Sequence, residues 1–244
     1  MTEAFIRSSL LLGDEVMKEL AKAKIILFGV GGVGSWCAEG LIRNGAHHLT
    51  IVDYDKVSES NINRQLEATS TTIGMIKVEV MKSRLLEINP EAEITAINAR
   101  YSDENSSIFE LDKYDYIIDA IDSLKDKIAL LLNASRCKAK VFSSMGAAKK
   151  LDPTKIKTAE LFSVRGCPLG AFIRKRMRQA KTLPAKEITC VYDEEVLKNK
   201  KDPDSRTNGS LVHITAIFGM TLCGMIIQDI SKKTLPVNDI IQAH

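Results

Sequence analysis

The feature that most constrains the fold is a glycine-rich turn between an apolar run and a helical pattern. The run Ile25-Ile-Leu-Phe28 leads into Gly29-Val-Gly31-Gly32-Val-Gly34, and a helix is expected from Gly32 to about Asn44. Glycines at this spacing permit a tight turn, and they let phosphate oxygens approach the free amides of the helix N-terminus. Asp53 follows Gly34 by 19 residues, a separation at which a carboxylate can accept hydrogen bonds from ribose hydroxyls. The pattern predicts a βαβ unit that binds a nucleotide, and it leaves the choice between NAD and ATP open.

Apolar strands and amphipathic helices alternate over the first 150 residues. Strands are expected at 24–28, 49–53, 93–98, 114–120 and 140–144, and helices at 14–22, 32–44, 75–88, 103–110 and 124–136. This alternation predicts right-handed crossovers and an α/β fold with a Rossmann-like, doubly wound, mainly parallel sheet.

The pattern changes after Gly146. Two later strands are expected at 155–162 and 187–192, on either side of a basic helix, and we expect antiparallel strands in this third of the chain. The polar stretch 191–208 predicts a mobile loop, followed by a last helix that begins near Ser210. Because no linker or repeat divides the chain, we predict one domain over 1–244, with a nucleotide-binding half (1–150) and a substrate and dimer half (151–244).

Charge and cysteine content limit the possible partners and compartment. The formal net charge of +3 does not by itself predict a nucleic-acid partner, but five cations gather in eight residues, namely Arg174, Lys175, Arg176, Arg178 and Lys181. This cluster is explained either by a solvated helix face or by contact with a phosphate backbone. The five cysteines form no C-x-x-C pair, so the usual spacing of structural zinc ligands is missing and a reducing compartment is favoured. With no signal-peptide pattern at the N-terminus, we expect a cytoplasmic protein.

One stretch is apolar enough to raise the question of a membrane. Residues 211–227 carry few polar side chains, and their length falls at the lower margin for spanning a bilayer. We interpret the stretch as a buried helix, and a membrane contact is the less favoured alternative.

The loop after the second expected strand favours ATP over NAD. It carries Asp53 and Asp55, followed by Ser60-Asn61-Ile-Asn63-Arg64-Gln65, and Lys77 begins the next helix. An enzyme that transfers a nucleotidyl group needs cations near the phosphates, because charge develops on the α-phosphate and on the departing pyrophosphate. Arg64 and Lys77 are the candidates, and the neighbouring amides can orient them. Either cation alone has a plain structural explanation, but together in this order they favour an adenylation site.

Two carboxylates lie at the end of the fourth expected strand and just beyond it, in Asp119-Ala-Ile-Asp122-Ser123. Ligands of open α/β sheets bind outside the carboxyl ends of the strands, and magnesium takes one or two carboxylates together with substrate phosphates. We therefore predict Asp122 as the Mg²⁺ ligand and Asp119 as a structural group that fixes the loop.

These motifs resemble those of the ThiF/MoeB/E1-like adenylating superfamily, which activates carboxylates with ATP. The matching elements are Gly29–Gly34, Asp53-Tyr-Asp55, Ser60–Gln65, Gly74-Met-Ile-Lys77, Ile88-Asn-Pro90 and Asp119–Asp122. The resemblance implies catalytic roles for Arg64, Lys77 and Asp122, and it implies a homodimer in which Arg7 reaches the ATP of the partner subunit. The full predicted nucleotide-binding set is Gly29, Gly31, Gly32, Gly34, Asp53, Asp55, Ser60, Asn61, Asn63, Arg64, Gln65, Lys77, Asp122 and Ser123.

Within this superfamily the chain is most similar to the branch of tRNA threonylcarbamoyladenosine dehydratases. The similar stretches are Gly31–Trp36, Ile118–Ser123, Gly146–Ile156 and Cys190–Glu195. The branch implies ATP-dependent activation of the threonyl carboxylate of N6-threonylcarbamoyladenosine (t6A) in tRNA, followed by closure to cyclic t6A. The cationic cluster at 174–181 would then contact tRNA, and a sulfur-transfer or other accessory protein is a possible partner.

Two alternatives stay open. The first is an adenylating enzyme for a ubiquitin-like sulfur carrier, although such enzymes commonly have the C-x-x-C zinc pairs that this chain lacks. The second is an NAD(H)-binding dehydrogenase or redox-sensing module, for which the sequence offers no evident acid–base partner. Cys190 is expected to be a buried small hydrophobe, and Cys167 is expected in a more exposed, electropositive loop where a thiol can be reactive.

Overall fold

A single mixed sheet runs through the part of the chain that the computed structural model describes, which is residues 3–203, 205 and 207–234. Its strands lie in the order β3-β2-β1-β4-β5-β7-β6. Their bounds are β1 (Lys24–Phe28), β2 (His48–Val52), β3 (Glu93–Ile97), β4 (Tyr116–Asp119), β5 (Lys140–Ser144), β6 (Lys157–Glu160) and β7 (Thr189–Tyr192). Neighbouring strands are parallel except β6 and β7, which pair antiparallel. The predicted α/β sheet with antiparallel pairing in the C-terminal third is confirmed.

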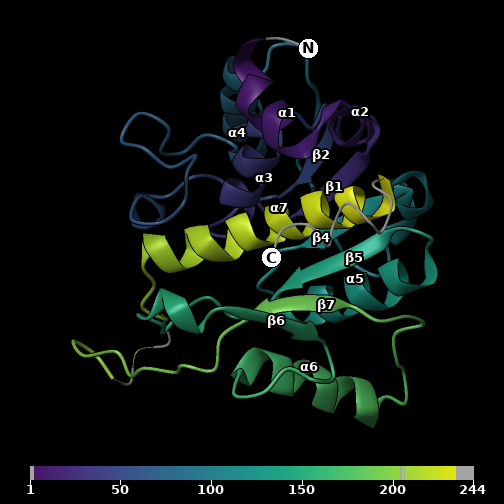
Figure 1. The fold of residues 1–244 in the computed structure, drawn as a ribbon. Helices are drawn as coiled ribbons and strands as arrows, with labels where there is room; N and C mark the ends of the chain where they lie inside the picture. The colour runs from purple at the N-terminus through teal and green to yellow at the C-terminus, as the bar shows by residue number, and fades with distance from the viewer. Residues whose placement is uncertain (1–2, 204, 206, 235–244) are drawn as a thin grey trace.

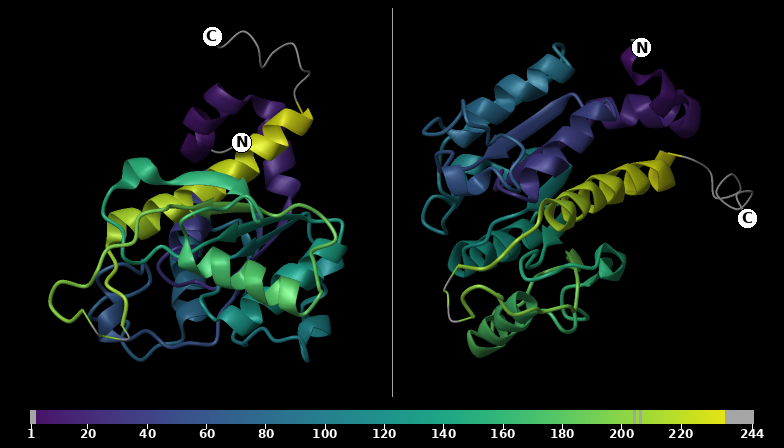
Figure 2. Two further views of the ribbon diagram at one scale, coloured as in Figure 1. Left: turned by 90° about the horizontal axis from the view of Figure 1, so that it is seen from below. Right: turned by 90° about the vertical axis from the view of Figure 1, so that its left-hand side faces the viewer.

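Helices cover both faces of this sheet (Figures 1 and 2). They are α1 (Ile6–Leu12), α2 (Asp14–Lys22), α3 (Gly34–Arg43), α4 (Lys77–Ile88), α5 (Leu124–Arg136), α6 (Pro168–Gln179) and α7 (Val212–Thr234). Short 3₁₀ turns occupy Glu3–Phe5, Glu59–Asn61, Ser106–Phe109, Leu111–Lys113 and Pro153–Lys155. Buried side chains of α2, α3, α4 and α7 pack on one face, and those of α5, α6 and the 3₁₀ turns before β4 pack on the other.

Strand β1 shows how the sequence creates two cores. Ile25 and Leu27 belong to the core under α3 and α7, whereas Ile26 and Phe28 belong to the core under α5 and α6. All four side chains are fully buried, because successive residues of a strand point to opposite faces and this strand is covered on both. The continuous apolar run in the sequence is thus explained by a central parallel strand.

Helix α7 lies diagonally across the sheet in Figure 1 and accounts for the apolar stretch near the end of the chain. Within the described residues it is the helix long and apolar enough to cross a membrane by length and composition. Its residues Ile214, Phe218, Leu222 and Ile226 are fully buried in the core that α3 also lines. The prediction of a buried helix is confirmed, with its first residue at Val212 and not at Ser210.

Some expected elements differ from those observed. The helix expected at 103–110 is a pair of 3₁₀ turns, because Glu110 adopts a left-handed backbone (φ 45°) that interrupts any longer helix. Helix α1 was not expected from the sequence. The predicted division at residue 150 falls within one continuous sheet, since β5 pairs with β7, and the two halves stay a prediction.

Candidate active site

The turn between β1 and α3 depends on two glycines. Gly29 has φ +86°, and a Cβ atom there would lie 2.6 Å from the carbonyl oxygen of Ala120. At Gly34 a Cβ atom would lie 1.8 Å from the carbonyl oxygen of Gly29. Any larger residue at either position would therefore force β1, α3 and the end of β4 apart. Gly34 closes the turn in this way, and it does not line the cavity described next.

A cavity of about 520 Å³ opens beyond the carboxyl ends of β1, β2, β4 and β5. Its lining includes these predicted site residues: Gly29, Gly31, Gly32, Asp53, Asp55, Arg64, Gln65, Lys77, Asp122 and Ser123. This is the position at which ligands bind in open α/β sheets. The glycine-rich turn, the acidic loop and the end of β4 therefore meet at one site, although they lie far apart in the sequence.

Asp53 joins the acidic loop to the glycine-rich turn. Its Oδ2 accepts a hydrogen bond from the Val30 amide at 2.9 Å, and its Oδ1 accepts one from the Asp55 amide at 2.9 Å. Both oxygens therefore hold backbone in place while the side chain stays partly accessible at the cavity wall. The predicted ribose contact would use the remaining lone pairs of this fixed carboxylate.

Arg64 lies against the glycine-rich turn and is held by its own loop. One guanidinium nitrogen donates to the Ser60 carbonyl and to Asn63 Oδ1, both at 2.9 Å. Asn63 in turn donates from Nδ2 to the Ser210 carbonyl at 2.9 Å. Ser60 and Asn63 thus act on Arg64 from outside the cavity lining and do not face the cavity themselves.

Asn61 also lies outside the cavity lining. Its Oδ1 accepts a hydrogen bond from the Ser58 amide at 3.0 Å, and its side chain is buried in the 3₁₀ turn. The structure therefore gives Asn61 a role in shaping the acidic loop, and its place in the nucleotide-binding set stays a prediction.

Lys77 is buried at the first residue of α4, and its ammonium enters the cavity wall. Its Nζ lies 3.1 Å from Asp55 Oδ2, and only 6% of its side chain is exposed against 48% for Asp55. The burial of the lysine and the exposure of its partner leave a cation directed toward the cavity, which suits a phosphate.

The two carboxylates at the end of β4 and just beyond it differ as the sequence predicts. Asp119 is fully buried, forms an ion pair with the buried Lys127 at 2.7 Å, and accepts a hydrogen bond from Ser143 Oγ at 2.6 Å. Asp122 is exposed at the cavity and makes no hydrogen bond or ion pair among the described residues. A single free carboxylate at the wall of a cavity that is predicted to hold phosphates fits Mg²⁺, which keeps several waters and takes phosphate oxygens as ligands. Among the described residues, no group of three or more acidic, His or Cys side chains forms a metal site of its own.

Several residues of the cavity were not predicted from the sequence. Arg100 donates from Nε to Asp126 Oδ2 at 2.7 Å, and its guanidinium carbon lies 5.7 Å from the centre of the Tyr54 ring. Burial raises the pKa of the Tyr54 hydroxyl. Arg100 follows β3 and Asp126 opens α5, so only the position of each at the same edge of the sheet could have indicated the pair.

Glu67 is a buried carboxyl close to this site. Its side chain is 1% exposed, and neither carboxylate oxygen has a hydrogen-bond partner among the described residues. Burial raises the pKa of Glu67 to about 7, with a further rise from Asp53 and an opposing effect of Lys77. No motif or spacing in the sequence indicates Glu67 as part of this site.

Cys167 corrects one expectation. It is 2% exposed and belongs to the core under α6, so the prediction of an exposed loop thiol is wrong; the residue before Pro168 turns inward where α6 begins. Cys190 is fully buried, and burial raises the pKa of its thiol. Its interpretation as a small buried hydrophobe is confirmed.

The residues predicted to contact other molecules lie on the surface. Arg7 is exposed on α1 and does not line the cavity. Lys175, Arg176, Arg178 and Lys181 are exposed on and after α6. Arg174 is half-buried and donates to the Leu161 carbonyl at 3.2 Å.

Comparison with known proteins identifies the family. Residues 6–243 match the model of the ThiF family. The tRNA threonylcarbamoyladenosine dehydratase of Bacillus subtilis is 32% identical over 244 residues, which cover 95% of this chain and 96% of that protein. The Haemophilus influenzae protein of the same name is 43% identical, with 89% of each chain covered.

A solved structure agrees with these relatives. The Escherichia coli tRNA N6-threonylcarbamoyladenosine dehydratase in complex with ATP superposes with a TM-score of 0.87 at 32% identity, covering 95% of each chain. The chain belongs to the ThiF family and, within it, to the tRNA threonylcarbamoyladenosine dehydratases.

Proposed function

We propose that this chain is an ATP-dependent enzyme that converts t6A in tRNA to cyclic t6A. The observation that carries this assignment is the cavity that joins the glycine-rich turn to Arg64, Lys77 and Asp122. The assignment is supported by the full-length likeness to enzymes of that name. A dehydratase of this kind removes the elements of water between the threonyl carboxylate and the rest of the modified base.

The reaction has two steps. A carboxylate oxygen of the threonyl group attacks the α-phosphorus of ATP, and pyrophosphate leaves with the electrons of the broken phosphoanhydride bond. The resulting acyl-adenylate is then attacked from within t6A; the new bond closes the ring, AMP leaves, and the attacking group loses its proton. The ring closure is favoured because both partners belong to one molecule.

Arg64 and Lys77 stabilise the charge of the first step. Negative charge grows on the α-phosphate and on the leaving pyrophosphate, and fixed cations at a cavity wall lower the free energy of that state more than that of the bound substrates. Asp53 holds the ribose, and the amides of the glycine-rich turn face the phosphates. Magnesium, held by Asp122 and by phosphate oxygens, would supply additional neutralisation of the phosphate charge.

The assembly proposed here is a homodimer in which Arg7 reaches the nucleotide site of the other subunit. Helix α1, which carries Arg7, also exposes Leu10 and Leu11 to 82% and 85%. Exposed apolar side chains of this size are commonly covered in an interface. Arg7 lies beside such a surface and does not line the cavity of its own subunit, which supports a role of Arg7 at the cavity of the partner subunit.

The substrate surface proposed here is α6 with the residues that follow it. Its exposed cations Lys175, Arg176, Arg178 and Lys181 suit the phosphate backbone of tRNA. The reducing cytoplasm is the proposed location, because all five cysteines are free thiols.

The test is the product itself. The purified chain is incubated with ATP, Mg²⁺ and tRNA that carries t6A, and the nucleosides are analysed by mass spectrometry. The proposal predicts conversion of t6A to a nucleoside lighter by one water, with ATP required. Absence of this product, together with ATP–pyrophosphate exchange that depends on a Gly-Gly-ended carrier protein, would assign the sulfur-carrier alternative.

A further inference from the structure

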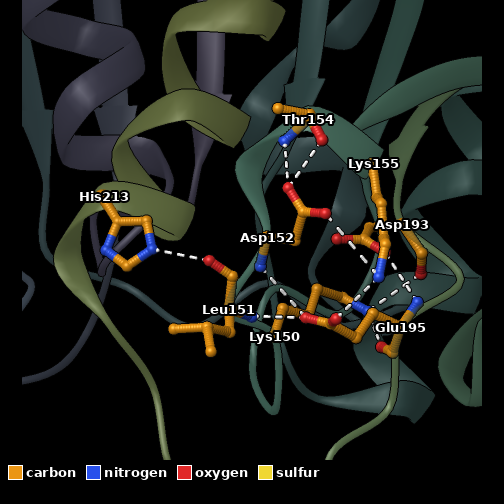
Figure 3. Close-up of polar contacts among 8 residues, drawn as sticks. All are labelled: Lys150, Leu151, Asp152, Thr154, Lys155, Asp193, Glu195 and His213. Carbon is orange, nitrogen blue, oxygen red and sulfur yellow. Dashed lines mark hydrogen bonds and ion pairs between the residues drawn. The ribbon is translucent and has the colours of Figure 1, made fainter.

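Two sequence stretches that mark the tRNA-modifying branch meet in the structure outside the cavity. The first follows β5 and includes Lys149–Lys155, and the second follows β7 and includes Asp193–Glu195. Figure 3 shows that they form one connected group of polar contacts, which His213 of α7 joins through the Leu151 carbonyl at 3.0 Å. The second stretch begins the connection from β7 to α7, and the described residues of this connection (193–203, 205 and 207–211) are called here the connecting segment.

Lys150 is the buried centre of this group. Its side chain is 4% exposed, and its Nζ donates to the carbonyls of Asp193 at 2.9 Å and Glu195 at 2.6 Å. Burial lowers the pKa of the Lys150 ammonium. A lysine that is buried against two backbone carbonyls fixes the path of the chain that carries them.

Glu195 makes the reciprocal contacts. Its Oε2 accepts hydrogen bonds from the amides of Leu151 at 2.5 Å and Asp152 at 3.1 Å, and its Oε1 lies 3.0 Å from Lys155 Nζ. Each stretch therefore holds the backbone of the other through a charged side chain, and charge-assisted bonds of this kind are stronger than neutral ones.

The same stretch also holds the far end of the connecting segment. The Lys149 amide donates to the Gly209 carbonyl, and the Leu197 amide donates to the Lys149 carbonyl, both at 2.8 Å. Lys149 itself has φ +60°, a left-handed backbone that lysine rarely adopts. Asn199 closes the span between these points, with bonds to the Thr207 carbonyl at 2.8 Å and from the Gly209 amide at 3.0 Å.

The residues held in this way belong to the cavity wall. Thr207, Asn208 and Ser210 of the connecting segment line the cavity. So do Gly146, Ala147 and Ala148, at the start of the stretch that follows β5. The Ser210 carbonyl accepts the bond from Asn63, whose side-chain oxygen accepts the bond from Arg64. Hydrogen bonds and the backbone between them therefore connect Glu195 and Lys150 to the Arg64 guanidinium at the cavity wall.

We propose that Lys150 and Glu195 are positioning residues that hold the connecting segment against the nucleotide cavity and thereby keep Arg64 aimed for the adenylation step. This inference rests on the proposed function and deepens it. Loss of the bonds from Glu195 should displace the cavity wall and misalign Arg64, which lowers kcat more than it weakens ATP binding, since the affected charge stabilisation belongs to the transition state.

The test compares Glu195→Ala with Glu195→Gln in the full-length chain. Alanine removes the acceptor for the Leu151 and Asp152 amides. A glutamine side-chain oxygen keeps that acceptor and loses the charge and the contact with Lys155. We expect Glu195→Ala to lower kcat for cyclic t6A formation by about tenfold or more, with ATP affinity changed less than about threefold. Glu195→Gln should keep most of the wild-type kcat. Hydrogen exchange should become faster in residues 196–203 and 207–210 of the alanine variant.

Controls separate this role from general stability. Glu194 is the exposed neighbour of Glu195 and pairs with Lys157 at 2.8 Å, so Glu194→Ala should leave kcat unchanged. Lys150→Met serves as a second test, with kcat referred to the folded, ATP-binding fraction. The proposal is overturned if folded Glu195→Ala turns over like the wild type, or if Glu195→Gln is as impaired as Glu195→Ala. Failure of the wild-type chain to form cyclic t6A would overturn the proposed function instead.

Discussion

The ammonium of Lys77 lies 3.1 Å from the carboxylate of Asp55, and the lysine is buried whereas the aspartate is half-exposed. Both residues line the cavity beside the glycine-rich turn. Because Asp55 keeps its contact with water, it can remain solvated when Lys77 turns to a phosphate. The Lys77 ammonium is therefore buried beside a counter-ion that is itself still in contact with water.

Removal of this cation should impair chemistry more than folding. We expect Lys77→Met, which keeps most of the side-chain volume, to lower kcat by about 100- to 1,000-fold, the scale for one preorganised group that stabilises transition-state charge. Steady-state kinetics of AMP release would measure it. Lys82→Met, five residues further along α4 and outside the cavity lining, is the matched control. A loss smaller than about threefold for Lys77→Met would remove Lys77 from the proposed mechanism.

Glu67 should make stability depend on pH near neutrality. Its pKa in the folded chain is about 7, against an ordinary 4.5, so the folded state holds the proton more tightly than the unfolded state. The contribution of this tighter proton binding to the free energy of unfolding is fully present below pH ~4.5 and is lost as pH rises through ~7. Glu67→Gln cannot ionise, and we expect it to gain up to about 3 kcal/mol of unfolding free energy over the wild type by pH 8, with no gain at pH 4.5. Urea unfolding across this range measures the difference, and a constant difference would contradict the shifted pKa.

The buried pair Asp119–Lys127 should be essential for stability. Asp119→Asn leaves the fully buried Lys127 without its partner at 2.7 Å, and breaking such a pair costs about 3–5 kcal/mol. The double variant Asp119→Asn, Lys127→Met should recover part of this loss, because no charge is then left unpaired. Denaturant unfolding provides the measurement, with Lys18→Met as an exposed-pair control. Equal stability of Asp119→Asn and the wild type would show that the pair is not structural.

Arg7 can be tested by mixing two inactive variants. If Arg7 acts in trans, a dimer of one Arg7→Ala chain and one Lys77→Met chain contains one complete site. We therefore expect Arg7→Ala and Lys77→Met to be poorly active alone. After subunit exchange, each mixed dimer should regain up to the activity of one wild-type site, which is about half the activity of a wild-type dimer. No recovery in verified mixed dimers would place Arg7 in its own subunit's site or outside the reaction.

The cations of α6 should set the salt dependence of tRNA binding. Lys175→Ala, Arg176→Ala and Lys181→Ala together should weaken binding and lower the slope of log K against log salt by about two to three units if each contacts a phosphate. Lys18→Ala with Lys22→Ala on α2, which packs on the opposite face of the sheet from α6, provides the control. An unchanged slope would show that these cations form a solvated helix face and do not contact the tRNA backbone.

The sequence predicts those parts of the molecule that local pattern determines. The bounds of β1, β5, α2 and α5 agree with expectation, because each has a clear period and a definite end. Several residues that face the cavity were also found, namely Gly29, Gly31, Gly32, Asp53, Asp55, Arg64 and Gln65, since the glycine-rich turn and the acidic loop both follow strands of a parallel sheet. Their chemical roles stay predictions until they are tested.

The parts that were missed depend on contacts between distant residues. Glu195 binds the amides of Leu151 and Asp152, and no periodicity relates positions so far apart. Cys167 is flanked by residues that are typical of exposed loops, yet the packing of α6 on the sheet buries its side chain. The stretch 191–208 reads as a mobile loop, but its first residues belong to β7 and others are held by Lys149 and Lys150.

The central claim is that ATP activates the threonyl carboxylate by adenylation, and an isotope label tests it most directly. The two carboxylate oxygens of t6A in tRNA are replaced by heavy oxygen, and the products are analysed by mass spectrometry after a single turnover. Attack of the carboxylate on the α-phosphorus predicts one labelled oxygen in AMP for each cyclic t6A formed. Label in inorganic phosphate, with ADP as the nucleotide product, would contradict adenylation, as would cyclic t6A formed with unlabelled AMP.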